Sequence, residues 1–315
     1  MKFFYIIVLI FILLSCSKEI EIDIPRTKPQ LVVYSTIVPF TIPKPKFLRL
    51  SLQTSKHIFD TSTTYINYAK VLFYENNTLK DTLKYNDSLR YYIISENDYP
   101  VAGNNYSIKI IKKGFDTVTA NTTIPNKVNI IDTNITPIAF FDDLGSVFSE
   151  VSITFNDPPN EENYYEIAIS DIAFSYENYD YFYDLTTNDN IITSESYYPS
   201  LIRFDVDKPK FLLFTDKQIN GQKYTVNVYY TPPQRISEYR YISKHYISVH
   251  LRNVTKEYYK FKTTMIQQSY SKTEDILYGM GEPLNVISNI NNGYGLFSGF
   301  NNDIVSFHID SVKLH

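Results

Sequence analysis

Short segments rich in β-branched and aromatic residues recur along this 315-residue chain and are separated by turn-forming residues. Between residues 31 and 125 they follow one another at about 8 to 12 residues, the spacing typical of β-sandwiches. Tyrosine and phenylalanine, with 29 and 21 residues, supply much of the pattern, and both favour half-buried pleated surfaces. The sequence therefore predicts a mainly β fold.

Residues 31–125 are predicted to form an Ig-like or transthyretin-like β-sandwich. Asn76-Asn77 has the composition of a hairpin turn, and Pro125 closes the module because proline cannot extend a hydrogen-bonded ladder. The expected strands are 31–38, 47–52, 69–74, 78–85, 89–94, 105–112 and 117–124.

Residues 126–315 are expected to form a larger, antiparallel β domain that carries one short α-helix. Alternating segments occur at 149–156 and 246–251, with turn residues such as Asp157-Pro158-Pro159-Asn160 nearby. A helix is predicted over 256–270, where Thr255 is a suitable N-cap and the apolar residues that follow share one helical face. Strands that return to the sheet are expected before the C-terminus.

An apolar run from Phe3 to Leu14 precedes the only cysteine of the chain, Cys16. The run is too short to span a bilayer, which takes roughly 20 helical residues, and Lys2 before it is typical of a signal peptide. Leu13-Leu14-Ser15-Cys16 resembles the bacterial lipobox, in which the cysteine is lipidated. Residues 1–15 are thus predicted to be a lipoprotein signal peptide and 16–30 a lipidated tether. The alternative is an ordinary secretory signal with a free cysteine.

Lys18, Glu19 and Glu21 follow this cysteine directly. The segment resembles the export signal that sends Bacteroidota lipoproteins to the outer face of the outer membrane, which implies a lipid-anchored protein facing the cell exterior. The alternative is a solvated tether without targeting information.

Three motifs together resemble one protein family. The first is the lipobox followed by residues 20–25 and Leu31-Val32-Val33, and the second is residues 155–159 with Asn163-Tyr164-Tyr165. The third is Glu282-Pro283 with residues 288–300. In this order they are similar to the Bacteroidota outer-membrane lipoproteins grouped as domain of unknown function 4249. The resemblance implies an N-terminal β-sandwich and a TonB-dependent transporter as partner, and it implies no catalytic residues.

Composition argues against several kinds of chemistry. The formal net charge of −4 gives no basic excess for nucleic-acid binding, and one cysteine permits neither an internal disulfide nor a thiolate metal cluster. The five histidines form no zinc-protease motif, and neither a nucleophile elbow nor a phosphate-binding loop occurs. No catalytic, cofactor-binding or metal-ligating residue is therefore assigned, and no cofactor is expected.

Aromatic clusters are the strongest surface signal. Tyrosine is enriched at protein interfaces, so a partner or ligand surface is predicted at Tyr179, Tyr181 and Tyr183, together with the glycine-rich segment Gly293, Tyr294, Gly295 and Gly299. The alternative for the tyrosines is a tyrosine-rich core. The alternative for the glycines, which is favoured, is a backbone role in tight turns, because glycine tolerates positive φ.

These features favour a non-enzymatic binding or accessory subunit of a TonB-dependent transporter, which captures or gates the transported ligand. Two alternatives stay open. One is a surface hydrolase that feeds such a transporter, and the other is a structural component of envelope assembly.

Overall fold

The computed structural model of the protein describes residues 28–39, 48–57, 60, 62, 64–94, 99–176, 179–192, 209–236, 240–278 and 284–314. Over these residues the chain is mainly β, which confirms the predicted fold class. Within them lie one α-helix, α2 (Lys256–Tyr278), and one 3-10 helix, η1 (Asp216–Gln218). The strands are β1 (Leu31–Ile37), β2 (Leu48–Thr54), β3 (Lys70–Glu75), β4 (Thr78–Asn86), β5 (Tyr91–Ile93), β6 (Asn105–Ile111), β7 (Val118–Thr123), β8 (Ile130–Phe141), β9 (Val147–Asn156), β10 (Tyr164–Tyr176), β11 (Tyr179–Phe182), β12 (Leu185–Thr186), β13 (Leu212–Thr215), β14 (Lys223–Tyr230), β15 (Gln234–Ile236), β16 (Arg240–Ile242), β17 (His245–Val254), β18 (Gly293–Ile309) and β19 (Val312–Lys313).

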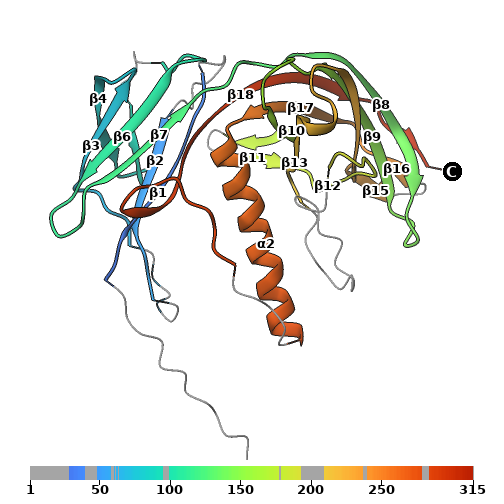
Figure 1. Ribbon diagram of the computed structural model, residues 1–315. Coiled ribbons are helices and arrows are strands. Elements are labelled where there is room, and N and C mark those ends of the chain that lie inside the picture. The colour runs from blue at the N-terminus through green and yellow to red at the C-terminus, as the bar shows by residue number, and fades with distance from the viewer. Residues whose placement is uncertain are drawn as a thin grey trace, which may run out of the picture.

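The first seven strands curl around a core of their own (Figure 1). They are hydrogen-bonded in the order β1-β2-β5-β4-β3-β6-β7, and every pair is antiparallel. Alternation along β1 buries Leu31, Val33 and Ile37. The turn at Asn76-Asn77 is confirmed, since both residues have positive φ, 49° and 65°, as a type I′ hairpin requires.

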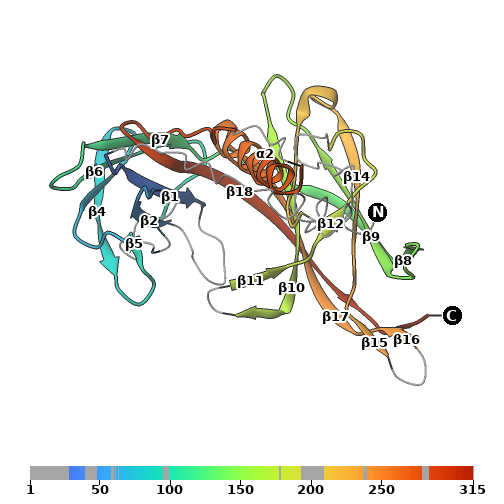
Figure 2. The same cartoon turned by 90° about the horizontal axis from the view of Figure 1, so that it is seen from below.

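Strand β18 links this unit to the rest of the chain (Figure 2). Residues 293–299 pair in parallel with β1, and residues 300–309 pair antiparallel with β17. Phe297 also packs in the N-terminal core. The boundary predicted at Pro125 stays a prediction, but β18 belongs to both sides of it. Periodicity alone does not predict the β1–β18 pairing, because the two strands lie at opposite ends of the sequence.

The C-terminal part consists of two facing sheets. Strands β11, β10, β17 and β18 continue the long sheet, and β12, β14, β9 and β8 form a second one. Their pairings are antiparallel, as predicted. The core between them contains Val151, Ile167, Val228 and Val249, each fully buried. A small sheet of β15, β16 and β19 lies at the edge of this part.

Helix α2 packs on the other face of the long sheet (Figure 1). Tyr258, Tyr259 and Phe261 of its first turns are buried against Tyr164 and Leu296. The helix has 23 residues and is not short as expected, since no glycine or proline interrupts it before Gly279. In the described part of the chain, no helix combines the length and the apolar character needed to cross a membrane.

Candidate functional site

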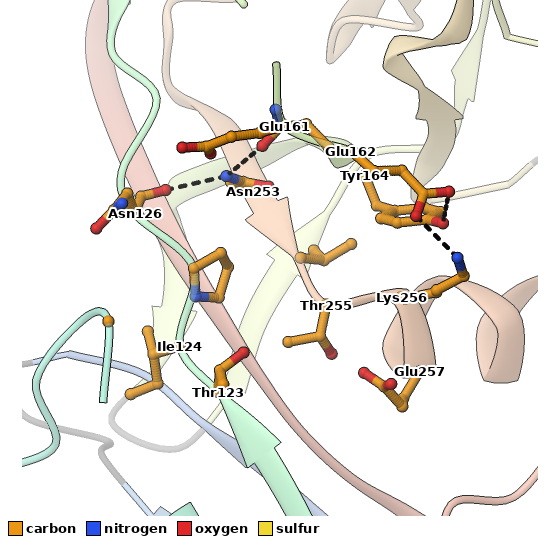
Figure 3. A pocket seen from close by; sticks show the side chains of 14 residues that line it. Thr123, Ile124, Asn126, Glu161, Glu162, Tyr164, Asn253, Thr255, Lys256 and Glu257 are labelled. Carbon is orange, nitrogen blue, oxygen red and sulfur yellow. Dashed lines mark hydrogen bonds and ion pairs between the residues drawn. The ribbon is translucent and has the colours of Figure 1, made fainter. Parts of the chain in front are cut away.

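A cavity of about 440 Å³ lies where the N-terminal unit meets the C-terminal part (Figure 3). Its volume falls within the usual range of ligand sites, about 300–1,000 Å³, and such sites occur preferentially between folded units. We refer to it as the junction cavity. It is lined by Gly103, Thr123, Ile124, Pro125, Asn126, Glu161, Glu162, Asn163, Tyr164, Asn253, Val254, Thr255, Lys256 and Glu257.

Two buried carboxylates hold the loop before β10 that forms one wall of the junction cavity. Asp157 accepts hydrogen bonds from the Tyr165 hydroxyl at 2.5 Å and from the Gly221 amide at 2.8 Å. Asp216 accepts a hydrogen bond from the backbone N–H of Asn163 at 2.9 Å. Burial raises the pKa of Asp157, and the negative charge of Asp216 adds to the increase, while the two hydrogen bonds oppose it. These contacts fix the position of Asn163.

The opposite wall is the start of α2. The Thr255 amide donates to the Gly299 carbonyl at 3.1 Å, and the Thr255 carbonyl accepts from Tyr259 at 3.0 Å. The Thr255 hydroxyl accepts from the Tyr258 amide at 3.4 Å, so Thr255 caps the helix as predicted. A Cβ on Gly299 would lie 2.2 Å from the Thr123 carbonyl oxygen. Glycine there allows β18 to pass between the end of β7 and the start of α2.

Charges in the junction cavity are unevenly paired. The Glu162 carboxylate accepts hydrogen bonds from Lys256 Nζ at 2.8 Å and from the Tyr164 hydroxyl at 2.5 Å. These three side chains lie together at one side of the cavity (Figure 3). Both hydrogen bonds, that from Lys256 first, hold the pKa of Glu162 below its ordinary value. Burial and the hydrogen bond to Glu162 raise the pKa of Tyr164 to about 12. The side-chain carboxylates of Glu161, which is exposed, and Glu257, which is partly exposed, have no hydrogen bond or ion pair among the described residues.

A chain of amides crosses the other side of the cavity. Asn253 Nδ2 donates to the Asn126 carbonyl at 3.0 Å and to Asn163 Oδ1 at 3.2 Å (Figure 3). Asn163 is 4% exposed, and its Nδ2 has no hydrogen-bond acceptor among the described residues. A buried donor without an acceptor is costly, so this nitrogen is suited to a bound group that supplies an oxygen.

A second polar cluster lies between α2 and the sheet. Glu166 is fully buried, forms an ion pair with Arg252 and accepts the Tyr258 hydroxyl at 2.7 Å. The guanidinium carbon lies 5.5, 5.6 and 5.1 Å from the ring centroids of Phe182, Phe211 and Phe300. Because its charges are paired and enclosed by aromatic rings, we interpret this cluster as the attachment of α2 to the sheet.

A serine, a histidine and an asparagine form a row on the same face of the sheet. Ser170 Oγ lies 2.9 Å from His250 Nε2, and Asn302 Nδ2 lies 3.1 Å from His250 Nδ1. The residue types are those of a nucleophile, a base and an orienting group. Burial, and then the positive charge of Arg252, lowers the pKa of His250 to about 3. Such an imidazole is a weak base at neutral pH, where a general base needs a pKa close to the working pH.

The predicted tyrosine surface is only partly at the surface. Tyr181 is 52% exposed, but Tyr183 is 7% exposed, and its hydroxyl donates to Asp171 at 2.5 Å. The prediction of Tyr183 as a surface residue is therefore wrong, because its ring fills the core beside Tyr230. Tyr179 lies in β11, and its side chain is outside the described residues.

The predicted glycine surface is corrected in the same way. Tyr294 is 51% exposed, but the three glycines of the segment let β18 approach neighbouring backbone. A Cβ would lie 2.7 Å from the Leu31 carbonyl oxygen at Gly293 and 1.8 Å from the Val33 carbonyl oxygen at Gly295. These glycines have the backbone role that was the alternative, although in a strand and not in a turn.

The tyrosine and glycine segments do not form one surface. Phe182 of β11 pairs with Ser170 of β10, Ser170 pairs with Ser248 of β17, and Ser248 pairs with Ser306 of β18. Phe182 and Ser306 therefore lie at the same level of the sheet. Ser306 is seven residues from Gly299 along β18, roughly 23 Å at 3.3 Å per residue. The predicted lipidation residue Cys16 and the predicted export residues Lys18, Glu19 and Glu21 lie outside the described residues.

The cavity residues themselves were hard to find from the sequence. Thr255 and Glu257 could be placed at a helix start, and Asn163 belongs to the second motif, but no periodicity brings residue 161 close to residue 257. The useful signal was indirect. Asp157 is followed by two prolines, which predict a turn, and a few residues later by Tyr164-Tyr165. In the structure the buried Asp157 carboxylate of this turn accepts the hydrogen bond of the Tyr165 hydroxyl.

The fold and the cavity define a mainly β protein with two cores joined by one long strand. The chain matches the family model described as a domain of unknown function (DUF4249) over residues 17–304. The match covers well over half of the 315 residues, so the chain belongs to this family, which confirms the predicted family membership. Neither the curated proteins nor the solved structures gave a match. Within the described residues, no group of three or more histidine, cysteine, aspartate or glutamate side chains is placed to hold a metal ion.

Proposed function

We propose that this protein is a non-enzymatic binding subunit that assists a TonB-dependent transporter by capturing or gating its ligand. The observation that carries the proposal is the junction cavity. Within the described part of the chain, the carboxylates of Glu161 and Glu257 and the side-chain Nδ2 of Asn163 in this cavity have no partner. Unpaired polar groups in a preformed cavity are expected of a binding site, because a ligand completes their hydrogen bonds.

The three family motifs support the same location. Leu31-Val32-Val33 of the first motif pairs with β18, and Asp157 and Tyr165 of the second hold the loop that carries Glu161. Gly299 of the third motif lies against Thr123 in the cavity wall. The described residues named here, one set from each motif, therefore lie at or beside the junction.

The location of the protein is part of the proposal. Lipidation at Cys16 would anchor it, and Lys18, Glu19 and Glu21 would direct it to the outer face of the outer membrane. We further propose that strands β1 to β7 form an Ig-like or transthyretin-like sandwich, which β18 completes.

Purification of the tagged full-length protein from native membranes in mild detergent tests this proposal. We expect an outer-membrane β-barrel of the TonB-dependent class to co-purify with the wild type. Cys16→Ala should lose both the label from a palmitate analogue and the barrel. A wild type that carries the label but purifies alone would contradict the accessory role, and a wild type without the label would contradict the anchor.

The hydrolase alternative has one observation in its favour, the Ser170–His250–Asn302 row. A serine-directed fluorophosphonate probe separates it from the binding role. Labelling of the wild type but not of Ser170→Ala would establish an activated serine and would replace the binding proposal by the hydrolase. We expect no labelling, because the low pKa of His250 leaves the serine without an effective base.

A further inference from the structure

We propose that the junction cavity binds an organic ammonium ion that has a hydrogen-bond acceptor oxygen a few atoms from its nitrogen. This inference rests on the proposed function and names the ligand class of that same site. Two sources share the chemistry, an amino sugar and an amino-acid amide. The cavity supplies matching groups for both parts of such a ligand.

The charge of the cavity selects a cation. Three carboxylates and one ammonium line it, which leaves two negative charges. Lys256 is already engaged by Glu162 at 2.8 Å, so among the described residues the carboxylates left without a partner are those of Glu161 and Glu257. Buried Asp157 and Asp216 lie behind the same loop, and Glu161 adds to the negative charge that acts on Asp157. An ammonium ion in the cavity would be attracted by all of these groups.

The amide chain selects an acceptor. Asn253 Nδ2 donates to the Asn126 backbone carbonyl, which can only accept, so the orientation of the Asn253 amide is fixed. Asn163 must therefore present its Oδ1 to Asn253, and its Nδ2 is left as a donor. Since Asn163 is 4% exposed and this nitrogen has no acceptor in the described chain, a ligand oxygen would complete the network.

The remaining lining suits a small carbon skeleton. Ile124, Pro125 and Val254 provide apolar surface, and the volume of about 440 Å³ is large enough for a monosaccharide or an amino acid. A bare metal ion fits the cavity less well, because one ion cannot both neutralise the carboxylates and accept a hydrogen bond from Asn163 Nδ2.

Titration of the full-length protein in mild detergent with five probes tests the inference. Glucosamine and alaninamide represent the two sources, and N-acetylglucosamine and N-acetylalaninamide are their uncharged counterparts. We expect one of the amines to bind at least tenfold more tightly than its N-acetyl form. Cyclohexylamine, which has the ammonium but no acceptor, should bind at least tenfold more weakly than that amine.

The carboxylates are tested with variants of the same chain. Glu161→Gln with Glu257→Gln should weaken binding of the amine at least tenfold. Glu150→Gln, on β9 in the other sheet, removes one charge outside the cavity and should leave binding unchanged. The proposal is overturned if neither amine binds at millimolar concentration, if the N-acetyl forms bind equally well, or if the double variant binds like the wild type.

Failure of this inference can be distinguished from failure of the proposed function. If the barrel co-purifies but no amine binds, the ligand class is wrong and the accessory role stands. If an amine binds with the expected discrimination but the protein purifies alone, the ligand class stands and the transporter role is wrong.

Discussion

Several buried tyrosines of this protein direct their hydroxyls at carboxylates. Each ring fills a core, while the hydroxyl gives the acid a hydrogen bond that burial would otherwise remove. Burial and the neighbouring acid together raise the pKa of these tyrosines. The pairs are Tyr106 with Glu75, Tyr165 with Asp157 and Tyr183 with Asp171, at 2.7, 2.5 and 2.5 Å.

Tyr183 and Tyr181 offer a direct test of this arrangement, because they are neighbours in sequence with opposite environments. Tyr183→Ala removes a buried ring and leaves Asp171 without its tyrosine donor. We expect the free energy of unfolding, measured with urea, to fall by about 3–5 kcal/mol. Tyr181→Ala, at 52% exposure, is the control and should change it by less than about 0.5 kcal/mol. Equal effects would show that Tyr183 does not belong to the core.

At the scale of elements, the strands of the N-terminal unit were predictable and several others were not. The sequence pattern placed the first seven strands within about two residues, and along β1, β6 and β7 alternate residues are buried. Strand β8 was missed, since polar residues such as Asp132 and Asn134 interrupt its apolar pattern. The cavity could not be predicted, because it forms only when the pairing of β1 with β18 brings distant loops together.

The glycines of β18 make that pairing possible. Gly295 has φ of +113°, and a Cβ there would lie 1.8 Å from the Val33 carbonyl oxygen. Gly114 also has positive φ, +90°, but a Cβ there would meet nothing within 4 Å. The two positions therefore share a backbone constraint and differ in the space around them.

Alanine at these two positions separates backbone strain from crowding. Gly114→Ala should lower the free energy of unfolding by about 1 kcal/mol, the cost of a left-handed backbone alone. Gly295→Ala should lower it by about 3 kcal/mol or more, because β1 and β18 must move apart as well. Thermal and urea unfolding monitored by circular dichroism measure both variants. A Gly295→Ala variant no less stable than Gly114→Ala would contradict the close approach.

At the scale of the whole molecule, β18 couples the N-terminal core to the hydrophobic cluster in which α2 packs on the sheet. Leu296 packs with the start of α2, and the next residue, Phe297, packs in the N-terminal core. Asn289 binds the backbone of Phe297 from both sides, with its Nδ2 donating to the carbonyl at 2.6 Å and its Oδ1 accepting from the amide at 2.9 Å. The segment before β18 is thereby tied to the strand, and disruption of either core exposes part of the same strand.

The last prediction concerns the independence of the N-terminal unit. A fragment of residues 28–125 keeps strands β1 to β7 but lacks the strand that pairs with β1, and it lacks Ile290 and Phe297 from its core. We expect this fragment to unfold at a lower temperature than the full-length protein and without a sharp transition. A peptide of residues 286–300 should bind it and raise the midpoint by roughly 5 °C or more, since a ligand of the folded state stabilises it. The same peptide with Gly295→Ala is the matched control and should have no effect, because its Cβ would meet the Val33 carbonyl oxygen. If the fragment alone unfolds cooperatively at the midpoint of the full-length protein, residues 28–125 form an independent domain, and β18 adds nothing to its stability.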